Sequence, residues 1–319
     1  MGPRHARRRA DSGRPFFTRR SFLLAVGGGV LFAACGTATD EEPQEESDAR
    51  RSGTPDDTRS DTSHFLRPVF PAEGGYLVAG RVQRLVYALA DAEGVITRDA
   101  PRELEFVIDS REDAAKPVRK LAALRADGVP RPYYAVEFIP QAAGTFDIYT
   151  EVDGERLVSA FAVSERADVR IPQPGDRLRP VETATTDDPM GVNPICTRKP
   201  PCPFHRHSLA AVLGKGHPVA FTLSTPAFCQ TGICGPTLDL LVEVAPRFPT
   251  VTYVHSEVYS NAGEVDDLAE ADLVPAVDAY GLTFEPSLFL LDGRGVLVKR
   301  LDFVWDESEL AESLRQLTA

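Results

Sequence analysis

The sequence divides at a polar, proline-rich stretch, and the residue patterns on its two sides predict two different folds. This stretch, residues 171–194, lies within a predicted linker of residues 166–195 and contains Pro172, Pro174, Pro180, Pro189 and Pro194. Before it, short runs alternate apolar and polar residues as strands do, and after it, apolar runs alternate with helical patterns. A chain of 319 residues has room for two such domains.

The first block, residues 64–165, reads as short strands separated by turn residues. Alternating apolar residues mark these strands, namely Leu104, Phe106 and Ile108, then Tyr134, Val136 and Phe138, then Phe146 and Ile148, then Leu157, Phe161 and Val163. Asp153-Gly154 lies between the last two runs and predicts a hairpin turn. The segment 140–146 resembles a turn and strand of immunoglobulin-like bacterial domains, which implies an all-β immunoglobulin-like sandwich. Because the block contains no cysteine, we expect a spacer or docking module.

The second block, residues 196–319, alternates strands and helices. The expected elements are a strand over 218–224, a helix over 236–246, a strand over 250–258, a helix over 265–280, a hairpin of strands 287–291 and 296–301, and a final helix. Asp306 and Glu309 have the spacing of a capping box at the start of that last helix. The block is therefore expected to form an α/β domain.

Two motifs lie at informative points of this order. Residues 225–236 read Thr-Pro-Ala-Phe-Cys-Gln-Thr-Gly-Ile-Cys-Gly-Pro directly after the first strand, and Glu285-Pro286-Ser287 directly precedes the hairpin. Together they resemble the thioredoxin-like superfamily, and in particular thioredoxin-like lipoproteins of Gram-positive bacteria with a Thr-Pro-Ala-x-Cys-x4-Cys-Gly-Pro segment. The resemblance implies a thioredoxin-like fold without a cofactor, a redox-active disulfide between Cys229 and Cys234, and a substrate-binding loop with Pro236, Glu285 and a cis-Pro286.

The four residues between the two cysteines constrain their geometry. On a continuous α-helix, positions five apart are rotated by roughly 140° and separated by about 7.5 Å along the axis, beyond the reach of a disulfide. We therefore expect a turn, which Gly232 permits. Pro236 suits a first helical turn, so Cys234 would lie at a helix start that stabilises a thiolate, which favours Cys234 as the attacking thiol.

The sequence leaves two other assignments of this pair to compare. In Cys-x4-Cys peroxiredoxins the first cysteine attacks peroxide, which would make Cys229 the nucleophile, but Pro226 and Thr222 break the expected peroxide-binding pattern. Sco-type copper proteins need a distant histidine in the later half of the domain, and no histidine follows His255. A thiol peroxidase thus remains an alternative, and copper handling is disfavoured.

A second group of cysteines precedes the first strand of this block. Cys196 and Cys202 bracket a proline-rich loop, with His205 and His207 close behind. We expect a Cys196–Cys202 disulfide and no metal, although a relay of electrons to the other pair or a metal site with His205 and His207 would also use these residues. His217 and His255 are expected to be ordinary loop and strand residues.

The amino-terminal residues predict export. Residues 1–35 combine seven arginines with a short apolar run and resemble a twin-arginine lipoprotein signal peptide with a lipobox ending at Cys35, the expected lipidation site. Residues 36–63 are rich in Asp, Glu, Ser, Thr and Pro and predict a disordered acidic linker. The formal net charge of −12, without a basic stripe, argues against nucleic acid as a partner.

These patterns together predict an extracytoplasmic thiol-disulfide oxidoreductase, tethered to the cell membrane through a lipid anchor. Its expected partners are thiols or disulfides of exported proteins, or a membrane redox partner. Two alternatives stay open: a non-catalytic scaffold or binding lipoprotein with a structural disulfide, and the peroxiredoxin-like thiol peroxidase.

Overall fold

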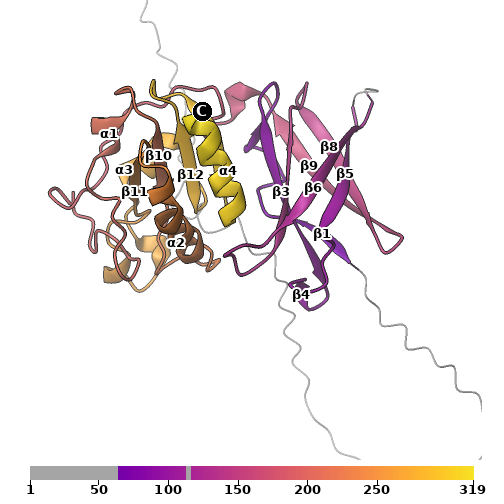
Figure 1. Ribbon diagram of the computed structural model, residues 1–319, viewed down its shortest axis with the longest axis horizontal. Coiled ribbons are helices and arrows are strands. Elements are labelled where there is room, and N and C mark those ends of the chain that lie inside the picture. The colour runs from indigo at the N-terminus through magenta and orange to yellow at the C-terminus, as the bar shows by residue number, and fades with distance from the viewer. Residues whose placement is uncertain (1–63, 113–115) are drawn as a thin grey trace, which may run out of the picture.

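The computed structural model describes residues 64–112 and 116–319, which form two units packed against each other (Figure 1). The predicted signal peptide, Cys35 and the acidic linker lie outside the described residues. Within the described ranges, no helix combines the length and the apolar character needed to cross a membrane.

The first unit is a single curled, nine-stranded sheet. Its strands are β1 (Phe65–Pro68), β2 (Leu77–Val78), β3 (Gln83–Asp91), β4 (Gly94–Val95), β5 (Glu103–Ser110), β6 (Val118–Arg125), β7 (Tyr133–Phe138), β8 (Gly144–Val152) and β9 (Glu155–Ser164). The order across the sheet is β1-β3-β7-β6-β5-β8-β9-β2, with β4 paired to β3. The sheet curls so far that Ala162 of β9 donates a backbone hydrogen bond to the Ala72 carbonyl, just beyond β1.

The sequence pattern explains most of this unit. The alternating residues of β5, β7, β8 and β9 face a common core, and Asp153 and Gly154 both have positive φ in the two-residue turn between β8 and β9. The all-β character is confirmed, while the immunoglobulin-like identity of the unit stays a prediction. The alternation rule missed β3, in which eight of the nine residues are buried, because both of its faces are covered.

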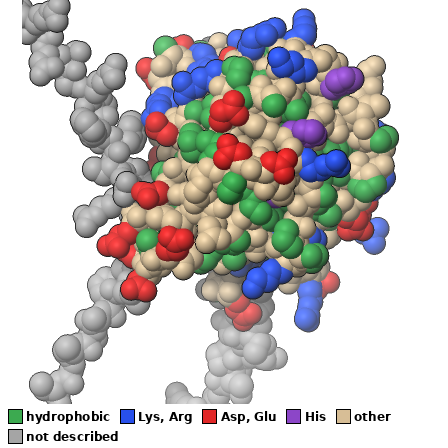
Figure 2. All heavy atoms as spheres, turned by 90° about the vertical axis from the view of Figure 1, so that its left-hand side faces the viewer, with side chains coloured by type: hydrophobic (Ala, Val, Ile, Leu, Met, Phe, Trp, Pro, Cys, Tyr) green, Lys and Arg blue, Asp and Glu red, His purple; other side chains and the backbone are tan. Residues whose placement is uncertain are grey.

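The second unit is a mixed four-stranded sheet with helices on both faces. Its elements are α1 (Leu209–Val212), β10 (Val219–Leu223), α2 (Cys234–Val244), β11 (Thr252–Ser256), α3 (Pro275–Tyr280), β12 (Ser287–Leu291), β13 (Leu297–Asp302) and α4 (Glu307–Thr318). The order is β11-β10-β12-β13, with β11 parallel to β10 and the other neighbours antiparallel. This is the order of elements that the sequence predicted for a thioredoxin-like domain. Figure 2 looks onto the side turned away from the first unit, where acidic, basic and hydrophobic side chains are mixed.

Two faces of this sheet bury two different clusters. Ala220, Leu288 and Leu290 pack with the apolar side chains of α2 and α4. Val219 and Phe221 point to the opposite face, where α3 lies, and belong to a cluster that continues into the core of the first unit. Successive side chains of the buried strands therefore point alternately into the two apolar clusters, as expected for a sheet covered on both sides.

Two details of the second unit differ from the sequence prediction. The helix expected over 265–280 is shorter: short 3₁₀ turns occupy 262–264 and 268–270, and the α-helix begins only at Pro275, whose fixed φ suits a first helical turn. At α4, the Asp306 side chain accepts from the Glu309 amide at 2.8 Å, as predicted for a helix cap. The Glu309 carboxylate, however, does not complete a capping box, because it binds the first unit.

That contact is a buried ion pair between the two units. Arg84 of β3 donates to both Glu309 carboxylate oxygens at 2.6 and 2.7 Å, and its remaining donors reach the carbonyls of Asp302 and Val304. Tyr133 of β7 donates to the same carboxylate. Burial opposes ionisation of Glu309, but the charge of Arg84 holds its pKa below the ordinary value. With every charge paired, the contact fixes one unit against the other.

The proline-rich stretch between the blocks lies along the second sheet. Gly175 and Leu178 donate backbone hydrogen bonds to the carbonyls of Leu297 and Gly295, and Leu297 donates to Asp176. Gln173 is fully buried and hydrogen-bonded to Gln83 of β3. The stretch predicted as a linker is therefore packed against both units.

Candidate functional site

The cysteine pair lies in the loop that joins β10 to α2. Cys229 and Cys234 form a disulfide with their Cα atoms 6.0 Å apart. The intervening chain turns back at Gly232, whose φ is +68° and whose amide donates to the Cys229 carbonyl at 3.1 Å. The turn expected from the spacing is thus present, and a residue with a side chain would be strained at this φ.

The two sulfurs differ in accessibility. Cys234 is the first residue of α2 and is 0% exposed. Cys229 is partly exposed, lines a cavity and lies 3.2 Å from the Thr231 hydroxyl, measured from Sγ to Oγ1. The helix start at Cys234 agrees with the sequence analysis, but the exposure favours Cys229 as the sulfur that meets another molecule.

The predicted proline loop lies beside this pair. The Glu285–Pro286 peptide bond is cis, as the sequence analysis expected. The Thr225 amide, at the start of the cysteine loop, donates to the Glu285 carboxylate. Of the three residues assigned to a substrate-binding loop, Glu285 lines the cavity, whereas Pro236 lies within α2 and neither proline is among the lining residues.

The Glu285 carboxyl group lies close to the disulfide. One of its carboxylate oxygens and the sulfurs of Cys229 and Cys234 all lie within 4.8 Å of one another. Burial raises the pKa of Glu285 to about 8, against the opposing hydrogen bond from Thr225. The carboxyl group is therefore mostly protonated at neutral pH and can exchange a proton with a neighbouring sulfur.

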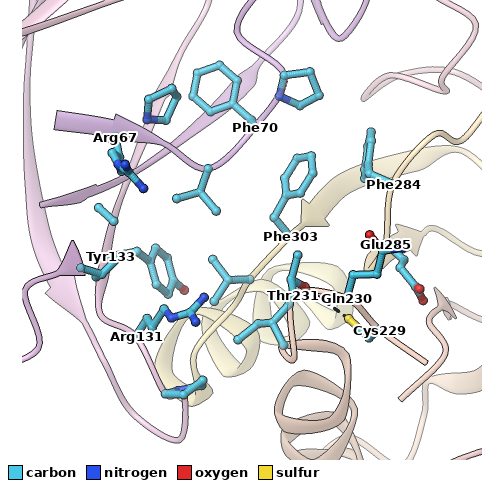
Figure 3. A pocket seen from close by; sticks show the side chains of 18 of the residues that line it. Arg67, Phe70, Arg131, Tyr133, Cys229, Gln230, Thr231, Phe284, Glu285 and Phe303 are labelled. Atoms are coloured by element: carbon cyan, nitrogen blue, oxygen red, sulfur yellow. Dashed lines mark hydrogen bonds between the residues drawn. The ribbon is translucent and has the colours of Figure 1, made fainter. Parts of the chain in front are cut away.

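The cavity beside Cys229 has a volume of about 450 Å³ and is formed by both units. In Figure 3, Cys229, Thr231, Glu285 and Phe303 of the second unit face Arg67, Phe70, Arg131 and Tyr133 of the first. Most of its side chains are apolar, the basic side chains are Arg67 and Arg131, and the acidic one is Glu285. Sequence reasoning gave the first block no part in a site, because its contributing residues are scattered over 67–71, β3, β4 and the 130–133 segment and form no recognisable motif.

A second cluster lies inside the same unit. Cys196 and Cys202 have free thiols and are buried together with His205 and His255. The structure thus differs from the expected Cys196–Cys202 disulfide. His207 is exposed and lies outside the cluster. The metal site considered in the sequence analysis included His207, and in the structure His255 of β11 lies beside the cysteines instead. His255 was missed because it lies more than fifty residues from the two cysteines and carries no local signal.

No protein-family model and no curated protein matches this chain. Among solved structures, the exposed lipoprotein thioredoxin Etrx1 of Streptococcus pneumoniae strain TIGR4 is 16% identical over an alignment that covers 44% of this chain and 100% of that chain, with a TM-score of 0.30. Because that TM-score is too low to assign a fold, the thioredoxin-like character of the second unit rests on its own sheet order and on the position of its cysteine pair.

Proposed function

We propose that this protein is a thiol-disulfide exchange protein of the thioredoxin-like type, with the Cys229–Cys234 disulfide as the bond that is exchanged. The observation that carries the proposal is the accessibility of this disulfide: one sulfur lines a cavity, and the other is buried at a helix start. A purely structural disulfide needs no such access. The cis-proline loop and Glu285 beside the pair further support exchange chemistry.

The exchange begins at Cys229, because the buried Cys234 cannot be reached in the disulfide form. A substrate thiolate attacks Cys229 Sγ, a substrate–Cys229 bond forms, and the Cys229–Cys234 bond breaks. Cys234 leaves as a thiolate at the start of α2, where unpaired helix amides lower the pKa of a leaving thiol. Glu285, protonated at neutral pH, can supply the proton that neutralises this thiolate.

The second step returns Cys229. Another thiol of the substrate attacks the mixed disulfide, its proton is released, and Cys229 leaves and is protonated in turn. The substrate then holds a new disulfide and the protein holds two thiols, so two electrons have passed from the substrate to the protein. The reverse sequence reduces a substrate disulfide, with Cys229 as the attacking thiolate and Cys234 as the resolving one.

The cavity gives this chemistry a substrate class. A cysteine that reaches Cys229 must pass between the apolar side chains of both units, including Phe70, Phe284 and Phe303. Arg67 and Arg131 lie at the first-unit side. We therefore propose an extended peptide segment with an apolar residue next to its cysteine as substrate, and the first unit as part of the binding site.

The predicted leader gives the proposed location. An exported chain acylated at Cys35 would act at the extracytoplasmic face of the cell membrane, on exported proteins or on a membrane redox partner. Metabolic labelling with a fatty acid tests this part: label should enter the wild type and be absent from Cys35→Ala. Label that persists in the variant would contradict lipidation at Cys35.

Trapping of mixed disulfides tests the exchange itself. Cys234→Ser leaves Cys229 without a resolving partner and should accumulate mixed disulfides with peptide substrates, whereas Cys229→Ser should trap much less. The measured reduction potential of the wild-type pair should lie above about −300 mV, the range of exchanging disulfides. A far lower potential with no trapped species would favour the non-catalytic scaffold, and consumption of peroxide by the reduced protein would favour the peroxidase.

A further inference from the structure

The cluster of Cys196, Cys202, His205 and His255 is built like a closed site. The four side chains are 4%, 6%, 3% and 0% exposed, and one ligand atom from each lies within 4.8 Å of the others. Two thiols and two imidazoles are thus held together in the protein interior, and no carboxylate belongs to this group. Gathering two thiols and two imidazoles in a protein interior is unfavourable unless something satisfies their polar atoms together, and His205 Nδ1 has no hydrogen-bond partner among the described residues.

The distances within the cluster fit one central ion. His255 Nδ1 lies 3.0 Å from His205 Nε2, 3.3 Å from Cys202 Sγ and 3.8 Å from Cys196 Sγ. Around a tetrahedral zinc ion with bonds of about 2.0 Å to nitrogen and about 2.3 Å to sulfur, neighbouring ligand atoms are separated by roughly 3.3 to 3.8 Å. The spacing of the cluster therefore lies close to that of a coordination sphere.

The surroundings orient the ligand atoms toward one another. His255 Nε2 lies 2.9 Å from the Ser224 carbonyl, to which it can only donate, and the lone pair of Nδ1 therefore faces the two sulfurs and His205. The Cys202 amide is aimed at Cys196 Sγ, 3.4 Å away. The loop itself is anchored at Thr197, whose amide and hydroxyl donate to Glu257.

We propose that Cys196, Cys202, His205 and His255 form a tetrahedral Cys2His2 site that binds one zinc ion. With four protein ligands and no exposed position, this is a structural site, since a catalytic zinc site keeps one position open. The ion would hold the 196–205 loop on β11 and would take no part itself in the thiol-disulfide exchange at Cys229 and Cys234.

The site is also coupled to the exchange loop through two short contacts. Ser224, whose carbonyl orients His255, directly precedes the 225–234 loop. The Thr197 hydroxyl accepts from the Ala227 amide at 3.2 Å. Binding of zinc would therefore stiffen the segment that carries Cys229.

The test is elemental analysis of the full-length chain purified under reducing conditions with zinc sulfate in the medium. One zinc per chain is expected in the wild type, less than a tenth of that in Cys196→Ser and His255→Gln, and full content in the matched controls Cys229→Ser and His207→Gln. Replacement of zinc by cobalt should give the absorption of tetrahedral cobalt together with sulfur-to-cobalt charge transfer.

A further variant keeps the test valid if the substitutions Cys196→Ser and His255→Gln prevent folding. His205→Cys preserves four ligands, so it should bind one cobalt with stronger charge-transfer absorption than the wild type. Wild-type protein without bound zinc or cobalt under these conditions, or a Cys196–Cys202 disulfide found by peptide mapping of the reductively purified chain, would overturn the proposal. Equal zinc content in Cys196→Ser and the wild type would overturn it as well.

Discussion

The two cysteine clusters of the second unit use the same residue type in opposite environments. Cys229 and Cys234 lie in a turn at the edge of a cavity and are joined to each other, while Cys196 and Cys202 are free thiols beneath the surface with two histidines. Solvent access and neighbouring side chains, more than the thiol group itself, therefore distinguish the pair proposed to exchange disulfides from the pair proposed to bind zinc. The contrast holds within one unit, over residues 196–234 of the chain.

Reactivity gives the largest expected difference between the clusters. After mild reduction of the native protein, iodoacetamide should modify Cys229 on the order of 100-fold faster than Cys196 or Cys202, since buried thiols react only after a local opening that costs a few kcal/mol. Peptide mapping over a time course measures all sites in one sample. Similar rates at Cys196 and Cys229 would contradict the contrast, and unfolded protein provides the control in which the rates should converge.

The first unit lines the cavity beside Cys229 and contributes no residue to the Cys196–Cys202 cluster. Breaking the Arg84–Glu309 ion pair, which joins the two units, tests this difference. Arg84→Met leaves the Glu309 carboxylate buried without its partner and should lower the free energy of unfolding by about 3–5 kcal/mol. Arg119→Met is the matched control, since its pair with Glu105 is exposed and should contribute less than about 1 kcal/mol. Denaturant titrations measure both.

The same variant separates the two clusters by function. A loosened contact between the units should slow exchange with apolar peptides at Cys229, because half of the cavity lining comes from the first unit. Zinc content should stay at the wild-type level, since all four proposed ligands come from the second unit. Exchange at the wild-type rate in a variant whose stability has fallen as expected would show that the first unit does not contribute to substrate binding.

The Cys229–Cys234 pair, unlike the Cys196–Cys202 cluster, has the Glu285 carboxyl group beside it, and the titration of this group can be measured. Its carboxyl group has an ordinary pKa of 4.5 in the unfolded chain and about 8 in the folded protein. Since the folded state holds the proton more tightly, the stability that this group contributes is fully present below pH 4.5 and is lost as the pH rises through 8. Glu285→Gln removes this loss, so the variant should gain on the wild type by on the order of 2 kcal/mol at pH 9, allowing for partial exposure.

Urea unfolding at pH 5 and pH 9 measures this effect. The difference in unfolding free energy between Glu285→Gln and the wild type should grow with pH. The matched substitution Glu270→Gln, at an exposed position, should give the same difference at both pH values. A constant difference for Glu285→Gln would mean that this carboxyl is ionised at neutral pH and cannot act as the proton donor to Cys234.

The features that could be predicted from the sequence are those that depend on residues close together in the chain. The Cys229–Cys234 turn, the cis bond before Pro286 and the Asp306 cap depend on residues within a few positions of each other, and each is present in the structure. The order of strands and helices in the second unit was also readable, because buried strands and amphipathic helices have different periods.

The features that could not be predicted depend on the tertiary fold. His255 joins Cys196 because β11 pairs with β10 in a register that places it beside Ser224. Arg84 looks like an ordinary polar residue of a strand, and only the docking of α4 gives it a buried partner. The cavity likewise combines residues that are more than 150 positions apart and share no motif.

The smallest expected effect is at Thr231, and it concerns the identity of the attacking thiol. In the reduced protein the Thr231 hydroxyl, 3.2 Å from Cys229 Sγ, can donate to a thiolate and stabilise it. A hydrogen bond to a charged group contributes about 1.5 kcal/mol or less at a partly exposed position, which corresponds to at most about one pKa unit. Thr231→Val, which keeps the shape and removes the donor, should therefore raise the pKa of Cys229 by up to one unit.

The rate of alkylation against pH, measured in the Cys234→Ser background so that a single exchanging thiol remains, gives this pKa directly. The mid-point should shift upward in Thr231→Val, while the rates at Cys196 and Cys202 stay as slow as before. If Cys229 instead titrates unchanged, and if Cys234 in the Cys229→Ser background has the lower pKa, then the helix start determines the nucleophile. The roles of the two cysteines would then be the reverse of those proposed here, because a thiolate is formed most readily where the positive end of the helix dipole lies.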